Sequence, residues 1–213
     1  MSATFHLTVI AKEPVAGRVK TRLVPPLSHD QAARIAGACL ADTFAAVTSA
    51  VERHPDVRAV ALIDGDAGRW IPAGYGVHDQ RGDGLGARLA NGFVDLGPGL
   101  IIGMDTPSAG PWFDAALEAL RAGDDAIGMT ADGGYWGIAL ADPDPAVFDG
   151  VPMSTDRTGQ AQLDRMRELG RVVRVLPTVR DLDTFDDLAP LVAELPGSHL
   201  AGVAAHLIGP RWG

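Results

Sequence analysis

In the stretch GLIIGMDTP, residues 99–107, an unbroken apolar run ends in a single carboxylate. A run without polar alternation is typical of a central strand that is buried on both faces. Asp105 then stands where a charge beside an apolar core needs a partner or a cation, and a lone carboxylate is typical of magnesium sites. The alternative role for Asp105 is that of a helix cap or turn residue.

Similar apolar segments alternate with helical ones along the whole chain. The predicted strands cover residues 7–11, 57–63, 75–80, 99–104, 125–130, 135–141 and 171–177. The predicted helices cover residues 28–50, 85–96, 111–123, 159–170 and 185–195. This alternation predicts an α/β fold, a three-layer α/β/α sandwich with a mostly parallel sheet. We expect a single domain over residues 1–195 and a C-terminal tail over residues 196–213.

The composition of the chain restricts its class. With 213 residues, 46% of them hydrophobic and 21% charged, the chain is long and apolar enough to bury a sizeable core. The single cysteine, Cys39, excludes an internal disulfide and is expected to be a core thiol in a reducing cytoplasm. No 18-residue apolar run and no signal peptide is visible, so we expect a cytoplasmic protein without a membrane span.

Positive charge gathers just after the first predicted strand, in AKEPVAGRVKTRL (residues 11–23), although the net charge of the chain is -9. The acidic balance disfavours nucleic acid as a partner. A local basic loop with a glycine instead suits the phosphates of a small anionic ligand, because free backbone amides and cations can surround phosphate oxygens. A solvated charged loop is the alternative. The sequence has no Walker A ending here.

Two glycine-containing segments also follow predicted strands, where ligands collect in parallel sheets. QRGDGLGARL (80–89) allows a ligand to approach the backbone closely, or else forms only a tight strand-to-helix connection. TADGGYWGIAL (130–140) contains an Asp-Gly turn between two strands. Its aromatic pair, Tyr135 and Trp136, is a candidate wall for an acceptor pocket.

The segment RDLDTFDDL (180–188) carries two aspartates after the last predicted strand, with Thr184 as a candidate helix N-cap. We expect Asp181 and Asp183 to point in different directions, so that both do not simply face one ion. The six histidines lack the spacing of a zinc site, and no Gly-x-Ser-x-Gly elbow of serine hydrolases occurs.

Together, in order from about residue 7 to 192, these segments resemble a bacterial family of GT-A-fold transferases. That family was formerly a domain of unknown function, and its members usually carry the name glycosyltransferase. The first loop and the late Asp-Leu-Asp-Thr segment also resemble the phospholactate and phosphoenolpyruvate guanylyltransferases and, more distantly, the molybdenum-cofactor nucleotidyltransferases. The resemblance implies a nucleotide-binding transferase that uses Mg²⁺ or Mn²⁺.

The resemblance also implies roles for residues. The residues implied to bind the nucleotide are Lys12, Arg18, Lys20, Arg22, Gln80, Gly84 and Gly86. The implied metal ligands are Asp105, Asp183 and Asp181, and the implied catalytic residues are Lys20 and Asp105. The residues implied to bind the acceptor are Asp132, Gly133, Gly134 and Tyr135.

Two departures from the family pattern bear on the acceptor: Met129-Thr130 replaces Gly-Pro, and Trp136 replaces Tyr. The mid-chain Asp-x-Asp of many glycosyltransferases is also missing. We expect a transferase with a nucleotide-sugar donor and a small-molecule acceptor. Nucleotidyl transfer from a nucleoside triphosphate to a phosphate or carboxylate, releasing pyrophosphate, is the close alternative. The third interpretation is a nucleotide-binding module without catalytic activity. Under any of these interpretations, a homodimer is one expectation for the assembly of the protein.

Overall fold

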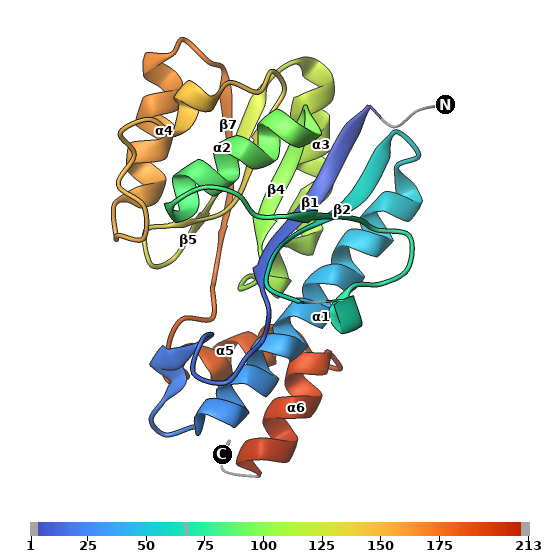
Figure 1. Ribbon diagram of the computed structural model, residues 1–213, viewed down its shortest axis with the longest axis vertical. Coiled ribbons are helices and arrows are strands. Elements are labelled where there is room, and N and C mark those ends of the chain that lie inside the picture. Colours follow the sequence, from blue (N-terminus) through green and yellow to red (C-terminus); the bar gives the residue numbers. More distant parts are fainter. Residues whose placement is uncertain (1–3, 67, 210–213) are drawn as a thin grey trace.

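The computed structural model describes residues 4–66 and 68–209, and seven strands form one sheet in the order β3-β2-β1-β4-β6-β5-β7 (Figure 1). The strands are β1 (Phe5–Lys12), β2 (Val57–Asp64), β3 (Gly76–Asp79), β4 (Gly99–Gly103), β5 (Asp125–Thr130), β6 (Tyr135–Leu140) and β7 (Val173–Val179). All neighbouring pairs are parallel except those of β6, which runs antiparallel to both β4 and β5. The predicted α/β fold with a mostly parallel sheet is therefore confirmed.

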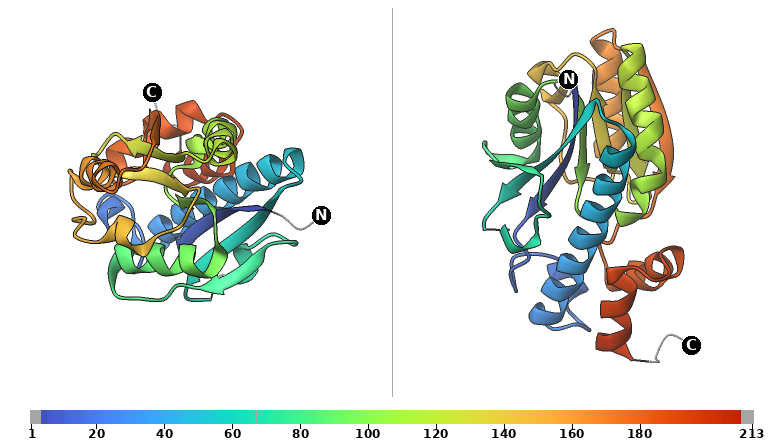
Figure 2. Two further views of the ribbon diagram at one scale, coloured as in Figure 1. Left: turned by 90° about the horizontal axis from the view of Figure 1, so that it is seen from above. Right: turned by 90° about the vertical axis from the view of Figure 1, so that its right-hand side faces the viewer.

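Helices cover both faces of this sheet, so the molecule has three layers (Figure 2). The helices are α1 (His29–Arg53), α2 (Gly84–Leu96), α3 (Phe113–Ala122), α4 (Thr158–Glu168), α5 (Phe185–Glu194) and α6 (His199–Ile208). Short 3₁₀ turns are η1 (Thr21–Leu23), η2 (Gly68–Trp70), η3 (Pro107–Trp112) and η4 (Pro145–Phe148). One core lies between the sheet and helices α1 and α3, and another between the sheet and helices α2 and α4.

Local capping chemistry fixes several helix ends where the sequence predicts them. Ser28 and Gln31 form a capping box at the start of α1, and Thr184 and Asp187 form one at the start of α5. Gly123 ends α3 in a left-handed conformation with a φ of 81°. Helix α3 itself begins at Phe113 rather than at residue 111, because the preceding residues wind as the 3₁₀ turn η3.

Helix α1 is a core helix. It is long and apolar enough to cross a membrane by length and composition alone, yet 56% of its most apolar window is buried inside the protein. Its apolar side packs against β1 and β2, and Cys39 on this helix is fully buried, as expected. Burial raises the pKa of the Cys39 thiol, so the group stays protonated and serves packing.

The segment after residue 195, expected as a C-terminal tail, contains helix α6 (His199–Ile208). Helix α6 packs along α1, and Leu200 and Ala204 belong to a separate buried cluster with α5 and the first half of α1. Asp42 of α1 accepts hydrogen bonds from the backbone amides of His199 and Leu200, so it caps α6. This part of the expected tail is integral to the fold, while residues 210–213 lie outside the described residues.

The separate buried cluster formed by α5, α6 and the first half of α1 also positions two loops. Leu23 of η1 and Leu182, which follows β7, are both fully buried in it. Figure 1 shows α5, α6 and η1 together beyond the end of the sheet at which β1 and β4 terminate. The basic loop after β1 and the acidic segment after β7 are therefore attached to one apolar base.

Candidate functional site

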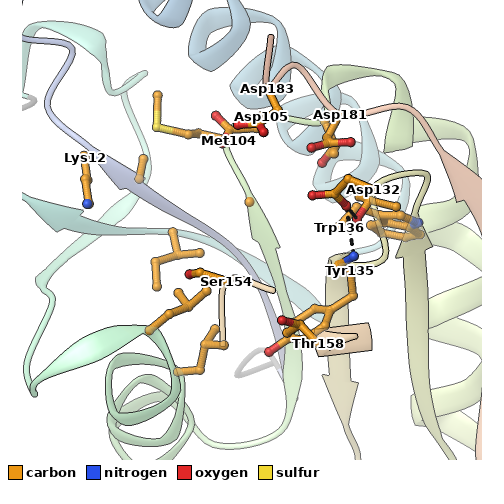
Figure 3. Close-up of a pocket in the computed structure, with 18 of the residues that line it drawn as sticks. Lys12, Met104, Asp105, Asp132, Tyr135, Trp136, Ser154, Thr158, Asp181 and Asp183 are labelled. Carbon is orange, nitrogen blue, oxygen red and sulfur yellow. Dashed lines mark hydrogen bonds between the residues drawn. The ribbon is translucent and has the colours of Figure 1, made fainter. Parts of the chain in front are cut away.

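A cavity of about 930 Å³ opens at the carboxyl ends of β1 and β4. Its walls are the β1–η1 loop, the start of α2, the β5–β6 turn, the loop before α4 and the segment after β7. Figure 3 shows its carboxylates on the opposite side from Lys12. Cavities at the carboxyl edge of an open α/β sheet are the usual ligand sites of such folds, because loops from several strands converge there.

The first side of the cavity, here called the basic wall, consists of Lys12, Arg18, Lys20, Arg22 and Arg88. The first four come from the loop after β1, which turns at Gly17 with a φ of 77°. Lys20 also has a left-handed backbone, with a φ of 49°, which is uncommon for a residue other than glycine. The structure thus brings all four predicted cations of the loop to one cavity.

Lys20 is committed to protein partners. Its side chain is only 8% exposed, its Nζ lies 2.8 Å from Oδ2 of Asp105, and it donates a hydrogen bond to the carbonyl of Leu182. Burial acts to lower the pKa of Lys20, but the Asp105 carboxylate outweighs it and the pKa is raised. Lys20 therefore ties together the loops after β1, β4 and β7, which is a positioning role that the sequence does not reveal.

Arg22 also has a carboxylate partner, because its Nη1 lies 2.5 Å from Oδ2 of Asp183. This pair is more exposed than the Lys20 pair, with 73% of the Arg22 side chain accessible, so solvent screens it. Among the described residues, Lys12 and Arg18 have no ion-pair partner. They are the cations of this loop that a bound anion can engage without breaking a pair.

Gln80 braces the sheet. Its amide nitrogen donates to the carbonyls of Ala11, at 2.7 Å, and Leu62, at 3.0 Å, while its oxygen accepts from Arg88. Arg88 in turn pairs with Asp64 at 2.7 Å. The Gln80 amide, which the resemblance assigns to nucleotide binding, thus holds the ends of β1 and β2 together.

The two glycines predicted at the nucleotide differ in placement. Gly84 lines the cavity with a φ of 82° and open space where a side chain would lie. Gly86 does not belong to the cavity lining, and a Cβ there would lie 3.2 Å from the Met153 side chain. Close packing against the loop before α4, rather than approach of a ligand, accounts for glycine at position 86.

The opposite side of the cavity, here called the acidic wall, consists of Asp132, Asp156 and Asp181. Asp132 Oδ1 accepts from the Thr130 hydroxyl at 2.6 Å and from the amide of Gly134 at 2.9 Å. Burial and then the nearby charge of Asp132 raise the pKa of Asp181 to about 6. Within the described residues, none of these three carboxylates is in an ion pair.

Asp181 and Asp183 both line the cavity, so the expectation that they diverge is wrong. Residues two apart on an extended segment lie on the same side, and Leu182 between them is buried in the apolar cluster on the other side. Figure 3 shows both carboxylates at the same end of the cavity as Asp105. Sequence spacing alone should have indicated this.

The carboxylates suit a hard divalent cation in their chemistry. Oδ1 of Asp105 is buried without a hydrogen-bond partner, and oxygen ligands are those that Mg²⁺ prefers. No three His, Cys, Asp or Glu side chains of the described residues are already grouped closely enough to hold a metal. Because Asp105 and Asp183 are paired with Lys20 and Arg22, a metal here would exchange partners with those cations.

The predicted acceptor residues split between the cavity and the packing. Gly134 and Tyr135 line the cavity, but Gly133 does not belong to its lining. A Cβ at Gly133 would lie 1.9 Å from the carbonyl oxygen of Asp156, so close backbone packing requires glycine there. Burial raises the pKa of the Tyr135 hydroxyl, which hydrogen bonds to Gln162 at 3.4 Å. Tyr135 therefore remains protonated.

Trp136 is mainly a core residue. Its side chain is 1% exposed, its indole nitrogen donates to the carbonyl of Pro177, and it occupies the space that a side chain on Gly128 would need.

The cavity also contains Arg88, Ser154 and Asp156, which the sequence analysis missed. Ser154 has a left-handed φ of 61° and no sequence signal marks it.

The sequence pattern of one bacterial family, described as "Uncharacterized protein conserved in bacteria (DUF2064)", matches residues 43–155. This range is more than half of the chain and includes Gln80, Asp105 and Asp132. It begins after the basic loop and ends before Asp181. No curated protein matches the chain.

Two solved structures share the fold. A protein of Desulfovibrio desulfuricans G20, named provisionally as a nucleotide-diphospho-sugar transferase, has a TM-score of 0.84 and 24% identity, over 96% of this chain and 95% of its own. A CMP:2-keto-3-deoxy-manno-octonic acid synthetase complexed with CTP has a TM-score of 0.53 and 13% identity, over 97% of this chain and 100% of its own. At such identities the likeness shows the fold alone.

Proposed function

The chain belongs to the bacterial protein family DUF2064, and we propose that it is a nucleotide-dependent, metal-assisted transferase of the GT-A type with a nucleotide-sugar donor. One observation carries the proposal. At the carboxyl edge of the sheet, a cavity joins unpaired cations on one wall to unpaired carboxylates on the other. Such a site suits two substrates, a donor whose phosphates lie at the basic wall and an acceptor whose reacting hydroxyl group lies at the acidic wall.

The donor's diphosphate binds the basic wall. Lys12 and Arg18 contact the phosphate oxygens first, since they have no ion-pair partner among the described residues. Asp105, Asp181 and Asp183 would hold Mg²⁺ or Mn²⁺, and the exposed Arg22 would then turn from Asp183 toward the phosphates, whereas the nearly buried Lys20 stays at the carbonyl of Leu182. The metal supplies neutralisation of the charge that develops on the leaving diphosphate.

In the transfer, the acceptor's hydroxyl oxygen forms a bond to the anomeric carbon of the sugar. The bond from that carbon to the phosphate oxygen breaks, and a nucleoside diphosphate leaves. The hydroxyl proton passes to a carboxylate of the acidic wall. Lys12 and Arg18 stabilise the negative charge of the leaving group, which is the main requirement of this chemistry.

The shared fold supports this proposal. The structure from Desulfovibrio is named for nucleotide-diphospho-sugar transfer, and the synthetase was solved with CTP, so both names connect this fold with nucleotides. Nucleotidyl transfer stays the second candidate, because the CTP complex places a triphosphate in a protein of the same fold. The two chemistries differ in their products, which are pyrophosphate in one and a nucleoside diphosphate in the other.

Calorimetry tests the donor. Nucleoside triphosphates and nucleotide sugars are titrated with Mg²⁺, with Mn²⁺ and without metal, and we expect metal-dependent binding of one base. Arg18→Gln should weaken that binding, whereas Arg34→Gln, an exposed arginine of α1 outside the cavity lining, should not. Silence across the whole panel would reject both candidate chemistries.

Phosphorus NMR of the products then separates the two reactions. Incubation with the bound nucleotide, metal and a cell extract should release a nucleoside diphosphate. Pyrophosphate would replace the first candidate by the second. Binding without either product would favour a nucleotide-binding module that performs no chemistry.

A further inference from the structure

The charged side chains of the cavity that are not in ion pairs lie on two walls, the cations on one wall and the carboxylates on the other. Lys20 is paired with Asp105, Arg22 with Asp183, and Arg88 with Asp64. Of the described cavity residues, the charged groups left without an opposite partner are Lys12 and Arg18 on one wall and the three aspartates on the other. The unpaired positive charge is thus confined to the phosphate-binding side.

The two backbone segments that carry Asp132 and Asp156 are packed closely against each other. The β5–β6 turn and the loop before α4 are in close contact, since the amide of Gly159 donates to the carbonyl of Gly133 at 2.8 Å. The carbonyl of Asp156 fills the space beside Gly133, and no Cβ would fit at either glycine. The Thr158 hydroxyl closes the loop by donating to the carbonyl of Pro152 at 2.8 Å. Asp132 and Asp156 are therefore carried by two interlocked backbone segments.

A bound metal would not neutralise this wall completely. The proposed metal site takes Asp181 together with Asp105 and Asp183, and it leaves Asp132 and Asp156 facing the cavity. The remaining wall offers hydroxyl groups and apolar surface, from Ser154, Thr155, Leu85 and Tyr135. No Lys or Arg side chain from the β5–β6 turn or the loop before α4 lines the cavity in the part of the chain that the structure describes.

A separate feature also points to a hydroxyl-bearing ligand. The Thr106 side chain lines the cavity, is 3% exposed, and its hydroxyl has no hydrogen-bond partner. A buried polar group without a partner is costly, so a ligand group that bonds to it gains affinity. A neutral hydroxyl can both donate to and accept from such a group.

We propose that the acceptor of this transferase is an alcohol without phosphate or carboxylate groups, either neutral or positively charged, and that Asp132 and Asp156 select it. This inference rests on the proposed function. An anionic acceptor would meet the carboxylates of Asp132 and Asp156, which have no ion-pair partner in the part of the chain that the structure describes. A neutral polyol or an amino alcohol would form hydrogen bonds with the same oxygens. The inference thereby disfavours the phosphate or carboxylate acceptor of nucleotidyl transfer.

The test begins with the nucleotide that calorimetry identifies, so that the two proposals can fail separately. A detergent-containing bacterial extract is passed over an anion exchanger at pH 7.5, and each fraction is incubated with the protein, the metal and that nucleotide. Phosphorus NMR measures release of nucleoside diphosphate or pyrophosphate. We expect at least about tenfold faster release with the unretained fraction than with the retained, anionic one.

Equal or faster release with the retained fraction, or release with neither fraction, would overturn the acceptor inference. The proposed donor site would survive that outcome, because metal-dependent nucleotide binding is measured beforehand. Failure of nucleotide binding removes both proposals together.

A pair of charge variants provides the second arm. Asp156→Lys should reduce turnover of the unretained fraction by about tenfold or more and should increase turnover of the retained one. Glu52→Lys, an exposed site on α1 outside the cavity lining, adds the same charge and should change neither. Far-ultraviolet circular dichroism and nucleotide binding confirm that each variant is folded. An Asp156→Lys protein with an unchanged ratio between the fractions would contradict the selection role.

Discussion

The basic wall of the cavity carries five cations and the acidic wall three carboxylates, and the two walls differ in how many of these charges are in ion pairs. On the basic wall, three side chains are paired with carboxylates, and Lys20 is nearly buried in its pair. On the acidic wall, no described cation pairs with the carboxylates. Paired charges hold loops in place, whereas unpaired charges remain available to a ligand. A cation that stands out in the sequence therefore need not be one that binds the ligand.

The largest expected effect comes from the pair of Lys20 and Asp105. Lys20→Met should lower the free energy of unfolding by about 3 kcal/mol, because it leaves the buried carbonyl of Leu182 without its donor and removes the partner of Asp105. Solvent replaces part of that partner, since the Asp105 side chain is 42% exposed. Chemical denaturation measures the change. Lys12→Met, at an exposed residue of the same wall, should cost less than about 0.5 kcal/mol. Equal losses would show that the two lysines do not differ in role.

The second effect concerns Asp105, the carboxylate that is paired with Lys20. Asp105→Asn should weaken metal-dependent nucleotide binding by about 100-fold, or roughly 2.7 kcal/mol, since a neutral amide is a poor ligand for Mg²⁺. Calorimetry with and without metal measures it. Asp95→Asn, outside the cavity lining, serves as the matched control. Unchanged binding in the first variant would remove Asp105 from the metal site.

A smaller effect separates paired from unpaired arginines. Arg18→Gln should reduce nucleotide affinity by about tenfold, while Arg22→Gln should reduce it by less than about threefold, because Arg22 must first leave Asp183. Titrations at two salt concentrations check the charge contribution, which should decline with salt. An Arg22 variant that loses more affinity than the Arg18 variant would reverse the distinction between the two cations.

The smallest effect is the pH dependence of the acidic wall. The pKa of Asp181 is raised to about 6, so its ionised form is disfavoured in the folded protein, and its contribution to stability is lost as pH rises from its ordinary value near 3.8 through 6. Metal affinity has the opposite dependence and should fall as pH drops below about 6, because protons compete for the carboxylate. Asp181→Asn should remove both trends. Thermal unfolding and metal titration between pH 4 and 8 measure them, and trends that persist in the variant would assign them to another group.

Much of the fold could be predicted because its signals are local. The unbroken apolar run of β4 and the side-chain caps at Ser28 and Thr184 act within a few residues of where they stand. The reversal of β6 and the packing of α6 on α1 could not be predicted in this way. They depend on contacts between segments far apart in the chain.

The site residues likewise include some that local sequence patterns mark and some that they do not. The basic loop, Asp105 and the late aspartates were recognisable as charged groups after strands, and the structure brings them to one cavity. The packing roles of Gly86 and Gly133, and the bracing role of Gln80, follow from neighbours that no local pattern names. Asp156 was missed because an exposed loop aspartate has no distinguishing pattern.

Local sequence patterns specify which segments become strands and helices, and hence that charged loops gather at one edge of a mostly parallel sheet. Which of those charges neutralise each other depends on the tertiary structure. Lys20 finds Asp105 and the carbonyl of Leu182 because the buried cluster under both loops brings them together. Electrostatic pairing depends on distance in space and on burial, and neither is written in the spacing of residues along the chain.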